Sequence, residues 1–287
     1  MKTATTSIQA WLDRHSPWLA GQGWIYPGWP LRAAPRIEAR IAGLAADQNL
    51  VISDEGLWHF AGSPRSDTQR IAGLLADFDV TVIVYCRRPD HFLEAWFKQG
   101  LKHGLGAPDV SRFLASPATG SQAFRDRLEL FAGLFGESRL VVAPYERAQM
   151  QGGDIIADFL ARSGLPVPGC GAGDRDGAAS NVSPPADVML MAGLLRQVFN
   201  LGQAQIDELL ATAPHAVIAA ARSTILSPEE AARIREDYRP LFHDIQQRFG
   251  TGAEPGFFLD WGDDVAAPAA SPLRAAYDAY LARTTGG

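Results

Sequence analysis

Cysteine is scarce in this chain: of its 287 residues, only Cys86 and Cys170 are cysteines. Two cysteines cannot build the disulfide framework that holds small secreted domains together, and no group of cysteine and histidine residues has the spacing of metal ligands. A disulfide-rich fold and a structural zinc site are therefore excluded.

Two further absences concern the surroundings of the protein. No apolar run is long enough to cross a membrane, and no secretory signal is recognisable. An excess of positive charge is also absent, since the net charge is −6. We therefore expect a cytoplasmic protein with no nucleic-acid partner and no integral membrane contact. An anionic ligand would need a site that is basic only locally.

Helical and strand patterns alternate through the first part of the chain. Apolar, β-branched runs predict strands at Asn49–Asp54, Val80–Cys86 and Arg139–Tyr145. Helices are predicted around them at Thr6–Leu19, Leu31–Ala46, Asp67–Leu75 (with Asp67 as N-cap), Asp90–Lys102, Ser121–Phe135 and Ile155–Arg162. The stretch "GWIYPGWP" after the first helix is interpreted as a turn-rich bridge. Strands that are separated by helices predict an α/β fold with a parallel sheet.

The later part of the chain is predicted to be helical. Its clearest helix starts with Ser227 as N-cap and Glu230 as the second half of a capping box. The apolar side chains of this helix follow a helical period and predict a face that docks on a core: Ile234, Tyr238, Leu241, Phe242, Ile245 and Phe249. We expect a single domain over residues 1–287, with an α/β core at 1–165 and a mainly helical part at 186–287.

Three short stretches are predicted to follow strands or begin a helix at the edge of the sheet where ligands bind in such folds. The first is the opening turn. The backbone N–H groups of Thr3 to Ser7, the helix dipole and the Lys2 ammonium could together hold a phosphate or sulfate. The alternative is an ordinary helix start at a chain end. No glycine-rich segment precedes Lys2, which disfavours an ATP-binding or GTP-binding P-loop.

The other two stretches carry charged side chains. Arg87 and Arg88 follow the predicted strand that ends at Cys86, and guanidinium groups bind phosphate in a bidentate way. Asp54 and Glu55 follow the strand before it, next to the aromatic segment that starts at Trp58. A carboxylate near aromatic surface becomes more basic when it loses water. Taken singly, each stretch could be solvated surface.

Together the three stretches resemble the sulfotransferases that use 3′-phosphoadenosine 5′-phosphosulfate (PAPS), and most of all bacterial members that act on carbohydrates. The 5′-phosphosulfate loop of that family reads Lys-[Ser/Thr]-Gly-Thr-Thr/Ser, which Lys2-Thr3-Ala4-Thr5-Thr6 resembles. The 3′-phosphate motif has an arginine, a proline two residues later and a serine eight residues after the arginine. Arg87 and Pro89 match it, whereas Ala95 stands in place of the serine. "ISDEGLWHF" resembles the segment with the catalytic glutamate, which points to Glu55.

The resemblance spans nearly the whole chain and implies a P-loop nucleotide hydrolase-like sulfotransferase fold, a three-layer parallel sheet flanked by helices. In that fold a strand leads directly into the phosphosulfate loop, but only Met1 precedes Lys2 here. We expect either a start further upstream or a sheet without its first strand, and we favour the former. Ala4 replaces the usual loop glycine, and Ala95 removes one hydroxyl from the 3′-phosphate site.

The resemblance also implies roles for individual residues. Glu55 would accept a proton from the acceptor hydroxyl, and Lys2 would stabilise the departing oxygen. The residues expected to bind PAPS are Lys2, Thr3, Ala4, Thr5, Thr6, Ser7, Arg87, Arg88 and Ala95, of which Arg88 ranks below Arg87. His59 and His103 are alternative bases, and Asn181 and Ser183 could cover the cofactor. No metal is required.

The acceptor implied by the resemblance is a hydroxyl group, in the first instance that of a saccharide or glycoconjugate. Tryptophans that could stack on sugar rings are Trp18, Trp24, Trp29 and Trp58, although tryptophans more often pack in the core or at its rim. Two other functions stay open. One is a P-loop kinase that acts on a small molecule, and the other is a non-catalytic relative that keeps the scaffold as a binding module.

Overall fold

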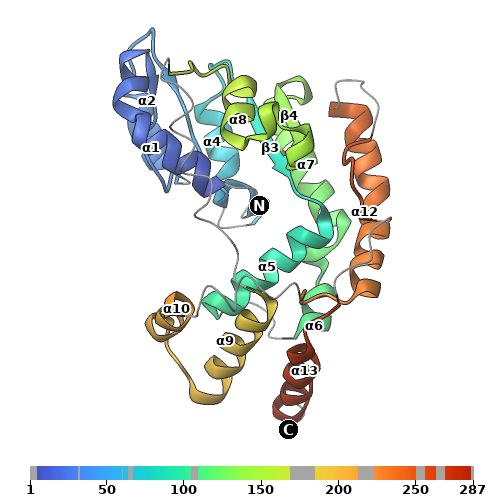
Figure 1. Cartoon of the computed structure of the whole chain (residues 1–287). Coiled ribbons are helices and arrows are strands. Elements are labelled where there is room, and N and C mark those ends of the chain that lie inside the picture. Colours follow the sequence, from blue (N-terminus) through green and yellow to red (C-terminus); the bar gives the residue numbers. More distant parts are fainter. Residues whose placement is uncertain are drawn as a thin grey trace. The chain divides into compact units, whose positions relative to one another are not determined.

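A computed structural model of the chain describes residues 5–31, 33–59, 61–63, 67–104, 109–168, 185–212, 223–249, 256–262 and 269–285. The chain forms two compact units (Figure 1). The first unit comprises Met1–Arg87, Arg125–Asn181 and His243–Leu259, and the second comprises Arg88–Phe124, Val182–Phe242 and Asp260–Gly287. Each unit is described by itself.

The first unit contains the strands. Its elements are α1 (Thr5–Gly21), β1 (Trp24–Ile25), α2 (Ala34–Ile41), β2 (Asn49–Leu50), α3 (Gly56–His59), α4 (Thr68–Leu74), β3 (Val82–Cys86), most of α7 (Ser121–Phe135), β4 (Leu140–Pro144) and α8 (Ile155–Ser163). The second unit is helical in the part of the chain that the structure describes. Its elements are α5 (Pro89–His103), α6 (Val110–Leu114), α9 (Ala186–Phe199), α10 (Gln203–Thr212), most of α12 (Pro228–Phe249) and α13 (Pro272–Thr285).

The described strands pair in parallel, as two sheets of two strands. In one sheet β1 pairs with β2, with Trp24 opposite Asn49. In the other, β3 pairs with β4 over five residues, with Val82 opposite Leu140. Strand β1 lies inside the stretch interpreted from the sequence as a turn-rich bridge, so that interpretation missed a strand. The three-layer sheet stays a prediction.

The core of the first unit joins α1 and α8 to the ends of β3 and β4. The buried residues of this cluster are Ile8, Trp11, Leu12, Leu19, Tyr26, Tyr85, Ala143, Ile155, Phe159, Leu160 and Leu165. Leu12 and Leu19 are completely buried, and a fully buried leucine contributes about 1.5–3 kcal/mol to folding. A polar contact reinforces the cluster, since the Tyr85 hydroxyl donates a hydrogen bond to Asp158 at 2.7 Å.

Helix α2 is shorter than the predicted helix at Leu31–Ala46. Pro35 stands in its first turn, where the missing N–H does no harm, but the same proline opposes a helix that begins earlier. Leu31 instead gives its N–H to the Asp54 carboxylate. Asp67 stands at the N-cap position of α4, as the sequence predicts, but its side chain makes no capping bond there. Asp67 accepts the N–H of Ala34, at the start of α2.

Helix α12 begins as the sequence predicts. The Ser227 hydroxyl accepts the N–H of Glu230 at 3.2 Å, and the Glu230 carboxylate accepts the N–H of Ser227 at 2.8 Å. The predicted capping box is therefore confirmed. Five of the six side chains expected on its docking face are buried, namely Ile234, Tyr238, Leu241, Phe242 and Ile245, whereas Phe249 is half-buried.

In the second unit, α5 packs closely against α9. Gly193 on α9 allows this approach, because a Cβ atom there would lie 3.0 Å from Leu101 and 3.2 Å from Tyr277. Arg196 on the same helix donates a hydrogen bond to the carbonyl oxygen of Lys102, in the last turn of α5. A cation at that end also suits the helix dipole. Within the described residues, no helix is both long and apolar enough to cross a membrane.

Candidate active site

The described part of the predicted site divides between the two units. Thr5, Thr6 and Ser7 begin α1 in the first unit, which also holds Glu55 and Arg87. Arg88 and Ala95 belong to the second unit. Lys2, Thr3, Ala4, Asn181 and Ser183 lie outside the described residues.

The first turn of α1 belongs to the same buried cluster as the carboxyl ends of β3 and β4. Ile8, in its first turn, shares a buried cluster with Tyr85 near the end of β3 and with Ala143 near the end of β4. Thr5 and Ser7 are half-buried and Thr6 is exposed. The first backbone N–H groups of a helix lack partners within the helix and carry partial positive charge. The start of α1 can therefore hold an anion at this edge.

A hydrogen bond ties α1 to the segment that leads to Glu55. The Gln9 side chain is buried and donates to the carbonyl oxygen of Ser53 at 3.0 Å. The first unit thus brings together two of the stretches singled out in the sequence, the start of α1 and the segment that ends at Glu55.

The two neighbouring carboxylates, Asp54 and Glu55, have different surroundings. Asp54 is buried and accepts two backbone hydrogen bonds, from Leu31 at 3.0 Å and from Gly56 at 2.8 Å. It therefore fixes the turn into α3. Glu55 is half-buried, and its Oε2 is a buried oxygen that has no hydrogen-bond partner among the described residues. Because buried carboxylate oxygens are normally hydrogen-bonded, Glu55 is the carboxylate that can accept from a ligand.

Tyr26 is a site candidate that the sequence analysis missed. Its side chain is 7% exposed, and its buried hydroxyl oxygen has no partner among the described residues. Burial, followed by the charges of Asp13 and Asp54, raises the pKa of Tyr26 to about 12. The hydroxyl therefore stays protonated at neutral pH and can donate a hydrogen bond.

The backbone places Tyr26 and Glu55 on one sheet edge. Tyr26 directly follows β1, and the N–H of Val51, just after β2, donates to the carbonyl oxygen of Ile25 at 2.9 Å. The segment with Glu55 continues from β2, and parallel strands end on the same side of a sheet. The sequence feature that could have predicted Tyr26 at a strand end is its position after the β-forming pair Trp24-Ile25 and before a proline.

The tryptophans are mostly committed to packing. Trp58 is 7% exposed and stacks on Phe131, with ring centroids 5.7 Å apart. Trp18 and Trp24 pack against the buried cluster of α1. Trp29 is 50% exposed, whereas the other three are buried or half-buried.

Arg87 directly follows Cys86, the last residue of β3, and is half-buried. The backbone at this point is fixed, because the N–H of Tyr145 donates to the carbonyl oxygen of Cys86. The Cys86 thiol is completely buried, and burial raises its pKa. Cys86 is therefore structural, and the next residue, Arg87, is the charged side chain at this strand end.

Arg88 is engaged by carboxylates of the second unit. Its Nε lies 2.9 Å from Asp90, and its Nη1 lies 3.5 Å from the Asp260 carboxylate. Arg235 contacts the other oxygen of Asp90 at 2.9 Å. Burial alone would raise the pKa of Asp90, but the hydrogen bond from Arg88 and the charges of His91 and Arg88 outweigh it and lower the pKa. A phosphate would have to compete with these carboxylates for Arg88.

The remaining candidates are less favourably placed. Ala95 on α5 is 8% exposed. Of the alternative bases, His59 is half-buried at the last position of α3, and His103 is exposed at the end of α5. No group of histidine, cysteine, aspartate and glutamate within the described ranges could hold a metal ion.

Comparison with known proteins found no matching family model, no matching curated protein and no matching solved structure.

Proposed function

We propose that this protein is a sulfotransferase, which moves the sulfuryl group of PAPS to a hydroxyl group of a saccharide or glycoconjugate. The observation that carries the proposal is the unpartnered, buried Oε2 of Glu55 in the described part of the chain. It lies in a segment that Gln9 ties to the first turns of α1. A group that can accept a proton and a helix start that can hold an anion are the two parts that such a transfer requires.

In the proposed reaction, Thr5, Thr6 and Ser7 bind the phosphosulfate through backbone N–H groups and hydroxyls. Lys2 neutralises the charge that develops on the bridging oxygen. Glu55 takes the proton of the acceptor hydroxyl while that oxygen forms a bond to sulfur. The bond from sulfur to the phosphate oxygen breaks, and 3′-phosphoadenosine 5′-phosphate (PAP) leaves. Catalysis of this kind depends mainly on positioning and electrostatics.

Arg87 is the proposed partner of the 3′-phosphate. Arg88 ranks below it, because Arg87 is the arginine that matches the motif. A phosphate would also have to compete with Asp90 and Asp260 for the Arg88 guanidinium group. Tyr26 joins the site as a hydrogen-bond donor to the acceptor, since its protonated hydroxyl is buried without a partner among the residues that the structure describes. Trp29 offers the exposed ring face on which a sugar could stack.

The test is transfer from radiolabelled PAPS to a panel of saccharides by Glu55→Gln and the wild type. Glutamine keeps the size of the side chain but cannot take the proton, so we expect turnover to fall about 10²–10⁴-fold with little change in PAP binding. The matched control is Glu38→Gln, whose carboxylate is 55% exposed in a surface ion pair. Undiminished transfer by Glu55→Gln would remove Glu55 from the mechanism.

A thermal-shift comparison separates the alternatives. A ligand that binds only the folded protein raises its melting temperature. Stabilisation by PAP but not by ATP supports the proposal, whereas stabilisation by ATP alone would favour the kinase. Stabilisation by PAP without transfer to any acceptor would favour the non-catalytic binding protein.

A further inference from the structure

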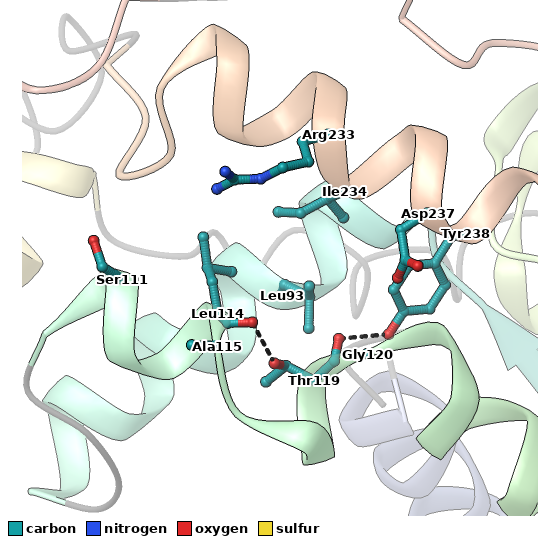
Figure 2. A pocket seen from close by; sticks show the side chains of 10 residues that line it. All are labelled: Leu93, Ser111, Leu114, Ala115, Thr119, Gly120, Arg233, Ile234, Asp237 and Tyr238. Carbon is teal, nitrogen blue, oxygen red and sulfur yellow. Dashed lines mark hydrogen bonds between the residues drawn. The ribbon is translucent and has the colours of Figure 1, made fainter.

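The second unit contains an open pocket of about 630 Å³, whose lining includes no residue of the proposed reaction (Figure 2). Its walls come from α5, from α6 with the turn that follows it, and from α12. The size falls within the range of small-molecule sites. What the pocket can bind depends on which of its polar groups are still available.

The walls are held in place by tertiary hydrogen bonds. The Tyr238 hydroxyl donates to the carbonyl oxygen of Thr119 at 2.9 Å, and the Thr119 hydroxyl donates to the carbonyl oxygen of Ser116 at 2.7 Å. Asp237 accepts from the N–H and the hydroxyl of Ser121. Because these contacts fix α12 against the segment that follows α6, the pocket is already formed without a ligand.

Two polar side chains of the lining are not used by these contacts. The side chains of Arg233 and Ser111 make no hydrogen bond or ion pair with any residue that the structure describes. In Figure 2 the Arg233 guanidinium extends over the pocket on the side of Ser111 and Leu114, whereas Asp237 and Tyr238 lie at the other end. The pocket therefore has a cationic end and an end whose polar groups are already paired.

Between the two ends the lining is apolar. Leu93 and Ile234 are buried beneath the pocket and Leu114 is half-buried beside them. A hydrocarbon body on this floor would be removed from water, and its anionic head could form two parallel hydrogen bonds with the guanidinium fork of Arg233.

We propose that this pocket is a second binding site, for an organic anion with a forked head, a carboxylate or a sulfate, on an apolar body of about eight carbon atoms. The head pairs with Arg233 and accepts from Ser111, and the body lies on Leu93, Leu114 and Ile234. The net charge of the chain is −6, so binding of an anion has to come from a local group such as Arg233 rather than from general attraction.

The proposal is tested by calorimetry with octanoate, below its micelle concentration, against wild type, Arg233→Gln and Arg239→Gln. Arg239 is the matched control, an exposed arginine of the same helix that does not line the pocket. We expect Arg233→Gln to weaken octanoate binding at least tenfold and Arg239→Gln to change it less than twofold. Octan-1-ol, which lacks the charge, should bind both variants and the wild type alike.

A second variant tests the position of the body. Ala115 is exposed and lines the pocket, so Ala115→Phe should fill part of it and weaken octanoate and octan-1-ol together. Acetate, which has the head without the body, should bind at least tenfold more weakly than octanoate. The proposal is overturned by wild type that does not bind octanoate, by equal binding to Arg233→Gln, or by unchanged binding to Ala115→Phe.

Discussion

Polar groups are buried both at the edge of the β1–β2 sheet, in the first unit, and at the start of α5, in the second unit. The two places differ in whether these groups have hydrogen-bond or ion-pair partners. At the sheet edge, Tyr26 Oη and Glu55 Oε2 are buried and have no partner among the described residues. At the start of α5, the Asp90 carboxylate forms ion pairs with both Arg88 and Arg235. A buried polar group without a partner lowers stability and is available for a hydrogen bond to a ligand, whereas a paired group stabilises the fold.

The largest effect is expected at the paired cluster. Asp90→Asn leaves two mostly buried guanidinium groups without their shared carboxylate, and breaking a buried ion pair lowers stability by about 3–5 kcal/mol. Urea denaturation at neutral pH measures the change. Glu236→Gln, an exposed site on α12, is the control and should lie within about 0.5 kcal/mol of wild type. A loss below about 1 kcal/mol for Asp90→Asn would show that the cluster does not hold the fold.

The same cluster predicts a dependence on pH. The pKa of Asp90 is lower in the folded protein than the ordinary value of 3.8. Its contribution to stability is therefore complete above the ordinary aspartate pKa and is lost as the pH falls through the lowered pKa. Asp90→Asn should lose less stability than wild type between about pH 5 and pH 2. Parallel acid profiles of the two proteins would contradict this.

The next effect separates two adjacent arginines. Arg87→Ala should weaken PAP binding by about 2–4 kcal/mol, the range for losing a charge-assisted contact in a partly desolvated site. Adenosine 5′-monophosphate lacks the 3′-phosphate, so its binding should barely change. Arg88→Ala should lower the free energy of unfolding, because it removes a partner of Asp90, and should change PAP binding less than Arg87→Ala does. Calorimetry measures nucleotide binding by both variants, and urea denaturation measures their stability. If Arg87→Ala weakens binding of PAP and of adenosine 5′-monophosphate equally, Arg87 has a structural role.

The Ala95 position gives a smaller effect. Ala95→Ser restores the hydroxyl that the sulfotransferase motif has there, and one net hydrogen bond would tighten PAP by up to about 1 kcal/mol. The same calorimetric titration measures it. Because Ala95 is 8% exposed, a serine that instead lowers stability and leaves PAP binding unchanged would mean that its hydroxyl points into the protein.

The smallest effect on stability is expected at Tyr26. Tyr26→Phe removes a buried hydroxyl that has no partner within the described residues, so unfolding should be unchanged or become harder by up to about 1 kcal/mol. If Tyr26 orients the acceptor, transfer should nevertheless fall and the KM for the acceptor should rise. Tyr85→Phe is the contrasting control, because its hydroxyl donates to Asp158 and its removal should destabilise. Wild-type kinetics in Tyr26→Phe would exclude it from the site.

Local sequence signals predicted the helices well. The predicted bounds of α7 agree with the structure, and the capping box of α12 needs only residues three positions apart. The prediction for α2 was too long, because Pro35 and the use of the Leu31 N–H by a distant carboxylate were not weighed. Asp67 stands at the N-cap position as predicted, but the partner of its side chain, Ala34, lies 33 residues away and could not be found from the local sequence.

The candidate site could be predicted only in part. Glu55 was singled out by the resemblance of its segment to the sulfotransferases, but the different surroundings of Asp54 and Glu55 depend on the N–H groups of Leu31 and Gly56. Tyr26 was missed because its proposed role depends on the pairing of β1 with β2, and the sequence pattern of a two-residue strand does not predict that pairing. Arg88 was ranked without knowledge of Asp260, which is 172 residues away.

The buried thiol at the end of β3 makes this protein suited to labelling kinetics. Cys86 is fully enclosed, and burial raises its pKa, so a thiol reagent reacts with it only when the strand end opens. In the Cys170→Ser variant, the rate at which Cys86 is labelled under native conditions measures local opening of the strand one residue before Arg87. Slower labelling in the presence of PAP would report the closing of that strand end without any assay of transfer.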